Sequence, residues 1–118
     1  KFENFYNTIM DVFNTYATDE IKGLKNTTRY PGNSVDYFHG IIFEIATNPN
    51  KDHVVKMFHS MNQVIEREAP KYYNDYLNFV DLLYKITTLE EYDSDAYWDF
   101  NDGNFGYDKN GKIKCLDV

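Results

Sequence analysis

The sequence predicts an α+β fold that is mostly helical, in which helices are packed with a short strand and a C-terminal β-hairpin. Three segments have apolar residues at three- and four-residue steps, the period of an amphipathic helix. One denser run of β-branched and aromatic residues is typical of a buried strand, and a turn motif separates two short apolar runs near the end. The 118 residues, 42% of them hydrophobic, suffice for one modest core, so we expect a single domain over residues 1–118.

The first predicted helix lies at the start of the sequence, where one apolar stripe comprises Phe2, Phe5, Ile9, Val12, Phe13 and Tyr16. A short helical or irregular stretch follows from Thr18, and Pro31-Gly32-Asn33-Ser34 is a chain break with turn residues at every position. Residues Val35–Ala46 are too dense in β-branched and aromatic side chains for one helix face. We therefore predict a buried strand there, which Gly40 would allow to bend.

Two further helices are predicted on either side of Pro70. The first runs from about Asp52 to Glu68, and its apolar face comprises Val54, Phe58, Met61 and Ile65. Pro70 ends that helix and suits the first position of the next one, which spans about Lys71 to Ile86. The inward-facing side of this second helix is predicted to contain Tyr72, Tyr73, Tyr76, Leu77, Val80, Leu83 and Tyr84.

The hairpin is predicted to have strands over Asn104–Tyr107 and Lys112–Asp117, joined by the strong turn sequence Asp108-Lys109-Asn110-Gly111. The single cysteine, Cys115, has apolar neighbours, which indicates a buried small side chain rather than a nucleophile. One cysteine excludes a disulfide framework within the chain and favours a reducing, cytoplasmic location.

The charge balance of the chain narrows the classes of partner. There are 19 acidic and 12 basic residues, so the formal net charge is −7, which argues against nucleic-acid binding because that needs a basic stripe. No apolar run approaches the roughly 20 residues of a membrane span, and no basic-then-apolar leader opens the sequence, so we expect no membrane association. Abundant Tyr and Asn are typical of an AT-rich coding genome, as in many viruses, which would place the protein in the host cytoplasm.

One stretch of thirteen residues without Lys or Arg concentrates acidic side chains: Glu90, Glu91, Asp93, Asp95, Asp99 and Asp102. The negative potential of this stretch would attract cations or a basic partner protein. A solvated loop without such a role has the same composition, so both interpretations are open.

The combination of residues with most potential for chemistry is Asp99-Phe100-Asn101-Asp102-Gly103-Asn104, followed by Asp117. Asp99 precedes Asn104 by five positions, and Asp117 follows Asn104 by thirteen. A tight hairpin between the last two would fold Asp117 back beside Asn104. An amide oxygen and a carboxylate suit Mg²⁺, and a further carboxylate nearby could accept a proton from an attacking hydroxyl.

This motif, with the hairpin and Leu116-Asp117 after it, resembles the catalytic loop and the metal-binding Asp of the protein-kinase-like superfamily. The resemblance is greatest to its divergent members, the phage-encoded protein kinases and the aminoglycoside phosphotransferases. It implies that Asp99 is the catalytic base and that Asn104 and Asp117 hold Mg²⁺. It also implies that ATP donates a phosphoryl group to a hydroxyl of a protein or a small molecule.

The same resemblance implies that the helix over Lys71–Ile86 lies under the loop, as in part of a kinase C-lobe, and that the strand over Val35–Ala46 leads into the hinge. Tyr97-Trp98 stand where that family has His-Arg, and the sequence contains neither a Gly-rich loop nor an identifiable phosphate-binding Lys. Three hypotheses stay open. The first is a phosphotransferase module, as a fragment of a longer kinase-like chain. The second is a catalytically inactive acidic interaction protein, such as a viral inhibitor that binds a host enzyme, and the third is a plain structural domain of a larger assembly.

Overall fold

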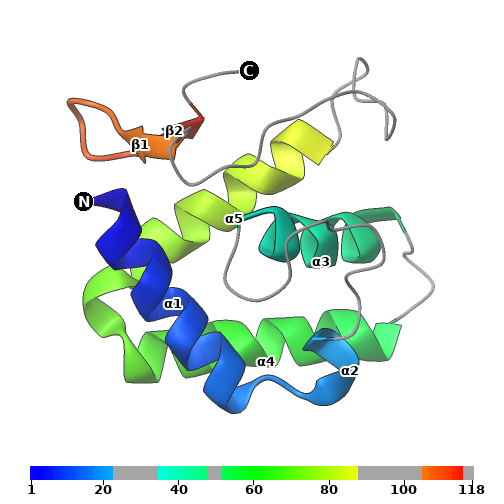
Figure 1. Cartoon of the computed structure of the whole chain (residues 1–118). Coiled ribbons are helices and arrows are strands. Elements are labelled where there is room, and N and C mark those ends of the chain that lie inside the picture. Colours follow the sequence, from blue (N-terminus) through cyan, green and yellow to red (C-terminus); the bar gives the residue numbers. More distant parts are fainter. Residues whose placement is uncertain (23–34, 48–51, 88–104, 116–118) are drawn as a thin grey trace.

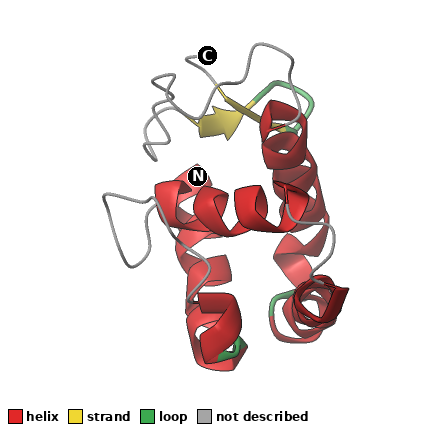
Figure 2. Cartoon of the chain, turned by 90° about the vertical axis from the view of Figure 1, so that its right-hand side faces the viewer, coloured by secondary structure: helices red, strands yellow, loops and turns green. Residues whose placement is uncertain are grey.

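The computed structural model of the protein describes residues 1–22, 35–47, 52–87 and 105–115 (Figure 1). The elements in chain order are α1 (Phe2–Tyr16), α2 (Asp19–Lys22), α3 (Val35–Thr47), α4 (Asp52–Glu68), the 3-10 turn η1 (Pro70–Tyr72), α5 (Tyr73–Thr87), β1 (Phe105–Tyr107) and β2 (Ile113–Cys115). Figure 2 shows the two strands as a small hairpin at one end of the helical body. The fold is α+β and mostly helical, as the sequence predicts.

Helix α1 covers the predicted segment, but its buried stripe is shifted from the predicted one. The buried residues are Phe2, Phe5, Tyr6, Ile9, Met10 and Phe13, whose spacing follows the 3.6-residue period closely. Val12 is half-buried, and Tyr16 is 46% exposed, so the prediction that Tyr16 faces the core is wrong. Tyr16 is the last residue of α1, and its hydroxyl donates a hydrogen bond to Glu68 of α4 instead.

Residues Val35–Thr47 form the helix α3, so the predicted strand over Val35–Ala46 is wrong, and so is its placement as the strand that leads into a kinase hinge. The ring of Phe38 lies beside the rings of Phe13 in α1, Phe58 in α4 and Phe79 in α5. Because α1, α4 and α5 all contact α3, this helix buries apolar residues on several sides and has no single apolar stripe. A dense apolar run of this kind cannot be told from a buried strand by periodicity alone.

Helix α4 has the predicted bounds, and three residues of its predicted face, Phe58, Met61 and Ile65, are buried. The chain leaves the helix at Ala69, whose φ of −136° and ψ of 59° are not helical. Pro70 then begins the 3-10 turn rather than the next α-helix, which starts at Tyr73.

Helix α5 turns its face slightly away from the predicted one. Tyr76 and Leu83 are buried as predicted, but Leu77 is 39% exposed and was wrongly assigned to the core. Phe79, which lies outside the predicted stripe, is fully buried. The rings with centroids 5.7–5.9 Å from that of Phe79 are Phe2, Phe5, Tyr6, Phe38 and Phe105.

The C-terminal hairpin is present, with strands over 105–107 and 113–115; Lys112 belongs to the connection rather than to the second strand, and the predicted strand positions 104, 116 and 117 lie outside the described residues. Its turn is the predicted one: the Gly111 amide donates to the Asp108 carbonyl over 3.0 Å, and Gly111 has a φ of +79°, a conformation that glycine adopts without steric cost. Cys115 is half-buried, so the prediction of a buried thiol holds only in part.

No helix among the described residues combines the length and the apolar content that crossing a bilayer requires.

Candidate functional site

The three residues for which the sequence predicts chemistry, Asp99, Asn104 and Asp117, lie outside the described residues, as does the acidic stretch 90–102. The structure does describe the chain between Asn104 and Asp117 and the helices that support it.

The strands β1 and β2 are antiparallel, and Phe105 pairs with Cys115, Gly106 with Lys114 and Tyr107 with Ile113. Residues directly opposite each other in such a ladder have Cα atoms about 4.5–5.5 Å apart. Phe105 is the next residue after Asn104, and Cys115 comes two residues before Asp117. The hairpin thus brings the chain back beside Phe105 ten residues later, at Cys115.

Aromatic contacts attach the open end of the hairpin to the helices. Phe105 is buried, and its ring centroid lies 5.5 Å from that of Phe2 in α1 and 5.8 Å from that of Phe79 in α5. Ile113 on the facing strand is also buried. Burial of these side chains is the main source of free energy for holding so small a sheet on the body.

A polar contact attaches the same hairpin nearer its turn. The Tyr107 hydroxyl donates a hydrogen bond of 3.0 Å to Oδ2 of Asp75 in α5, and the Lys1 ammonium lies 4.5 Å from the centroid of the Tyr107 ring. Partial burial, and then the hydrogen bond to Asp75, raise the pKa of Tyr107 well above its ordinary value. The hydroxyl therefore stays protonated and acts as the donor at neutral pH.

The turn of the hairpin is closed by one carboxylate. Oδ1 of Asp108 accepts hydrogen bonds from the backbone amides of Asn110, at 2.8 Å, and Lys112, at 3.0 Å. The backbone amide of Lys112 and then that of Asn110 favour the charged form, so the pKa of Asp108 lies below its ordinary value. This is the short-range bonding that Asp residues supply in turns.

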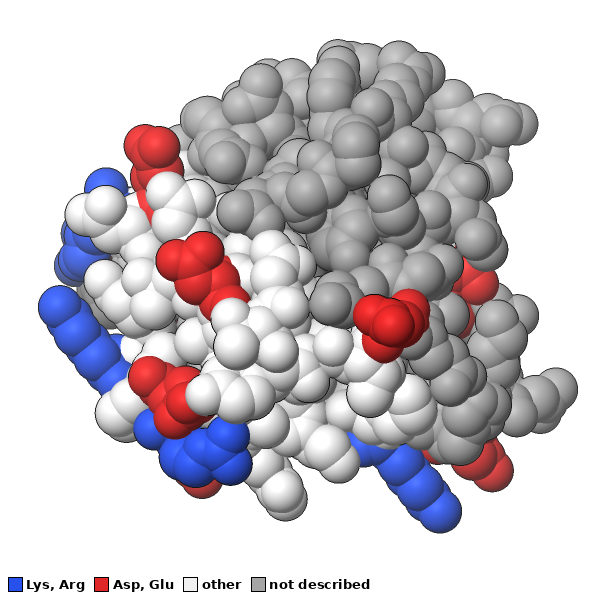
Figure 3. Space-filling model, turned by 60° about the horizontal axis from the view of Figure 1, so that its bottom comes forward, with Lys and Arg blue, Asp and Glu red and all other residues white. Residues whose placement is uncertain are grey.

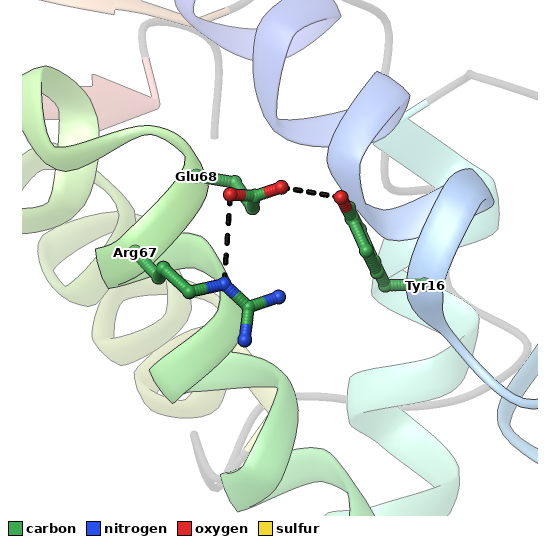
Figure 4. Close-up of polar contacts among 3 residues, drawn as sticks. All are labelled: Tyr16, Arg67 and Glu68. Atoms are coloured by element: carbon green, nitrogen blue, oxygen red, sulfur yellow. Dashed lines mark hydrogen bonds and ion pairs between the residues drawn. The ribbon is translucent and has the colours of Figure 1, made fainter.

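A second polar cluster lies at the far end of α1 (Figure 4). The Tyr16 hydroxyl donates to Oε1 of Glu68, and Nε of Arg67 lies 3.5 Å from Oε2 of the same carboxylate. The hydrogen bond raises the pKa of Tyr16 and lowers that of Glu68. All three side chains are substantially exposed, so this cluster is a surface contact between α1 and α4, of a kind that contributes little stability.

The described part of the face in Figure 3 carries both acidic and basic side chains. Within the four described ranges, no group of three or more His, Cys, Asp or Glu residues is arranged as a metal site. Asp108 in the hairpin and Asp75 beside it both use their carboxylates as hydrogen-bond acceptors.

The partnership of Asp75 with Tyr107 is the feature that sequence reasoning missed. The two residues are 32 positions apart, and no motif links them. One signal was available: Phe105 and Tyr107 alternate along a strand, so both must lie on the face that Phe105 turns to the core.

No family model matches the sequence, and neither a curated protein nor a solved structure matches it significantly.

Proposed function

We propose that this chain is a kinase-like phosphotransferase module that moves a phosphoryl group from a magnesium-bound nucleotide to a hydroxyl. Asp99 would act as the catalytic base, and Asn104 and Asp117 would hold Mg²⁺. The observation that carries the proposal is the register of the hairpin. It pairs Phe105 with Cys115, the described residues from which the chain continues to Asn104 and Asp117.

The support of the hairpin by α5 agrees with the same proposal. The resemblance implies a long helix under the catalytic loop, and α5 contacts the hairpin through Phe79 and Asp75. Both contacts are made within the first two turns of a 15-residue helix that ends shortly before Asp99 in the sequence. The helix, the loop and the hairpin thus occur in the order that a kinase-like C-lobe requires.

The proposed residues divide the chemistry between them. The Asp99 carboxylate would orient the substrate hydroxyl and accept its proton as the hydroxyl oxygen bonds to the terminal phosphorus of the nucleotide. The bond from that phosphorus to the bridging oxygen breaks, and the nucleoside diphosphate leaves with the electron pair. Asn104 and Asp117 supply oxygen ligands of the kind that Mg²⁺ prefers.

The charge of the chain implies that nucleotide binding requires a metal ion. With a formal net charge of −7, the protein repels a free nucleoside triphosphate, which is itself an anion. The proposed ligands Asn104 and Asp117 add no positive charge of their own. Mg²⁺ would offset the phosphate charge, so binding of the nucleotide should disappear when the metal is chelated.

The test is a thermal-shift measurement on the full chain with Mg-ATP, repeated with ATP and excess EDTA. A ligand that binds only the native state raises the melting temperature, so Mg-ATP should raise it and ATP with EDTA should not. Asp117→Asn removes one proposed ligand charge and should abolish the shift. Asp11→Asn makes the same chemical change at an exposed position of α1 and should leave the shift intact.

A second variant separates binding from chemistry. Asp99→Asn should keep the Mg-ATP shift but lower the rate of phosphoryl transfer by about 10²–10⁴-fold, the usual contribution of a positioned base. If the unaltered chain shows no shift with Mg-ATP, or if Asp117→Asn shifts as far as the unaltered chain, the proposal is wrong. The acidic interaction protein would then be the better hypothesis, because it needs no nucleotide.

A further inference from the structure

The hairpin is too small to hold its own position. Each strand has three residues, and an isolated two-stranded hairpin is at best marginally stable in water. Its orientation on the molecule must therefore come from the contacts that it makes with α1 and α5. Among the described residues, two of these contacts stand out, because both are made by β1 and both reach α5.

The two contacts match in spacing. Phe105 and Tyr107 lie on one face of β1 and are about 7 Å apart along the strand. Their partners on α5, Phe79 and Asp75, are four positions apart, which is about one turn and 6 Å of helix. The earlier strand residue meets the later helix residue, so these two β1 side chains reach α5 in antiparallel order, while β2 packs against the same helix.

The two attachment points differ in kind. The rings of Phe105 and Phe79 meet edge-on at 5.8 Å, a contact with weak directional preference that tolerates small rotations. The hydrogen bond from Tyr107 to Asp75 is directional and weakens steeply as its angle departs from linear. The apolar contacts of both strands therefore hold the hairpin on the body, and the polar contact adds a directional constraint on its tilt.

We propose that the Tyr107–Asp75 hydrogen bond orients the hairpin on α5, and that Tyr107 is a positioning residue for nucleotide binding at the open end of the hairpin. This inference rests on the proposed function, because Asn104 and Asp117 adjoin the strands that the bond orients. Tyr107 would not touch the nucleotide. Its hydroxyl would act by limiting the arrangements in which the two ligands are held.

The decisive variant is Tyr107→Phe, which removes the hydroxyl and keeps the ring against Lys1. Loss of one hydrogen bond of ordinary strength should weaken the affinity for Mg-ATP by about fivefold. In the chain that keeps Tyr107, Asp75→Asn has a side-chain oxygen that can accept the bond and should retain most of the affinity, whereas Asp75→Leu should lose it as Tyr107→Phe does. A difference between the two Asp75 variants is not expected if Tyr107 only fills space.

The matched control is Tyr16→Phe. It removes another bond between a tyrosine hydroxyl and a carboxylate, but at the end of α1 that contacts α4. Tyr16 is fourteen positions along α1 from Phe2, which contacts the hairpin, and that corresponds to about 21 Å of helix. Tyr16→Phe should leave the affinity for Mg-ATP unchanged.

A second readout needs no nucleotide. Cys115 is the only cysteine of the chain, and it is half-buried at the open end of β2. If the bond fixes the hairpin, a thiol reagent should modify Cys115 several times faster in Tyr107→Phe than in the unaltered chain or in Tyr16→Phe.

The two readouts keep the two proposals apart. An unchanged Cys115 rate in Tyr107→Phe overturns the orienting role of the bond, whatever the nucleotide does. A faster rate with an unchanged Mg-ATP affinity overturns its role in nucleotide binding. If the unaltered chain fails to bind Mg-ATP, the proposed function falls, and the Cys115 rates still decide whether the bond orients the hairpin.

Discussion

At the scale of single residues, Asp108 shows how one side chain determines a local structure. Its carboxylate accepts hydrogen bonds from two backbone amides of the turn, and its backbone carbonyl accepts a third from the amide of Gly111. These bonds satisfy donors that would otherwise need water, and Gly111 supplies the positive φ that the turn requires. The sequence Asp-Lys-Asn-Gly predicts this turn because each of these requirements is local.

We expect the turn to weaken in acid. The folded-state pKa of Asp108 lies below its ordinary value of 3.8, so its stabilising contribution is complete above about pH 4 and is lost as the pH falls through the folded-state value. Asp108→Asn keeps an oxygen acceptor and has no charge to titrate. The free energy of unfolding from urea titrations should fall more steeply for the unaltered chain than for Asp108→Asn between pH 5 and pH 2. Parallel pH curves would contradict this assignment.

At the scale of elements, the helices were predictable where each buries one face and unpredictable where one is covered on several sides. Helix α4 buries one stripe, and both of its ends were predicted correctly. The residues of α3 contact three other helices, so a pattern rule that expects one stripe assigns them to a strand. The length of the run was the signal that favoured a helix, since 13 residues exceed an ordinary strand.

The candidate site likewise has parts that the sequence predicts and parts that it does not. The hairpin and its turn depend on neighbouring residues, so they could be predicted from the sequence. The contacts that attach the hairpin to α5 could not, because Asp75 and Tyr107 meet only through the tertiary fold. The assignments of Asp99, Asn104 and Asp117 fall outside the described residues and stay predictions.

One partly buried hydrogen bond joins α4 and α5 and gives a prediction at this scale. The Tyr76 hydroxyl donates to Oδ1 of Asn62 over 2.7 Å, and burial raises the pKa of Tyr76, so the donor persists at neutral pH. Tyr76→Phe should lower the free energy of unfolding by about 1 kcal/mol, because the carbonyl of Asn62 loses its partner. The control is Tyr73→Phe on the same helix, at a half-buried residue, which should cost clearly less. Equal losses in urea denaturation would show that the bond contributes nothing specific.

At the scale of the whole molecule, the aromatic residues unite elements that are distant in sequence. The ring of Phe79 in α5 contacts Phe2 in α1, Phe38 in α3 and Phe105 in β1. Figure 1 shows these elements arranged around α5, with the hairpin beside the start of α1. Such a shared residue couples the hairpin to the helical core, so the molecule should unfold as one unit.

Phe79→Ala tests that coupling. Truncation of a fully buried Phe costs about 3–5 kcal/mol, a large share of the 5–15 kcal/mol typical of a domain, so the midpoint of urea unfolding should fall sharply. Leu77→Ala on the same helix removes a side chain that is 39% exposed and should cost about 1 kcal/mol. Phe79→Leu keeps much of the volume and replaces Phe79→Ala if that variant does not fold. Within each variant, fluorescence and backbone circular dichroism should report a single transition with the same midpoint.

Hydrogen exchange of the unaltered chain tests the same coupling. If the hairpin amides exchange with solvent far more readily than those of α5, Phe79 does not join the two. The hairpin would then be free to move independently of the helices that are proposed to orient it.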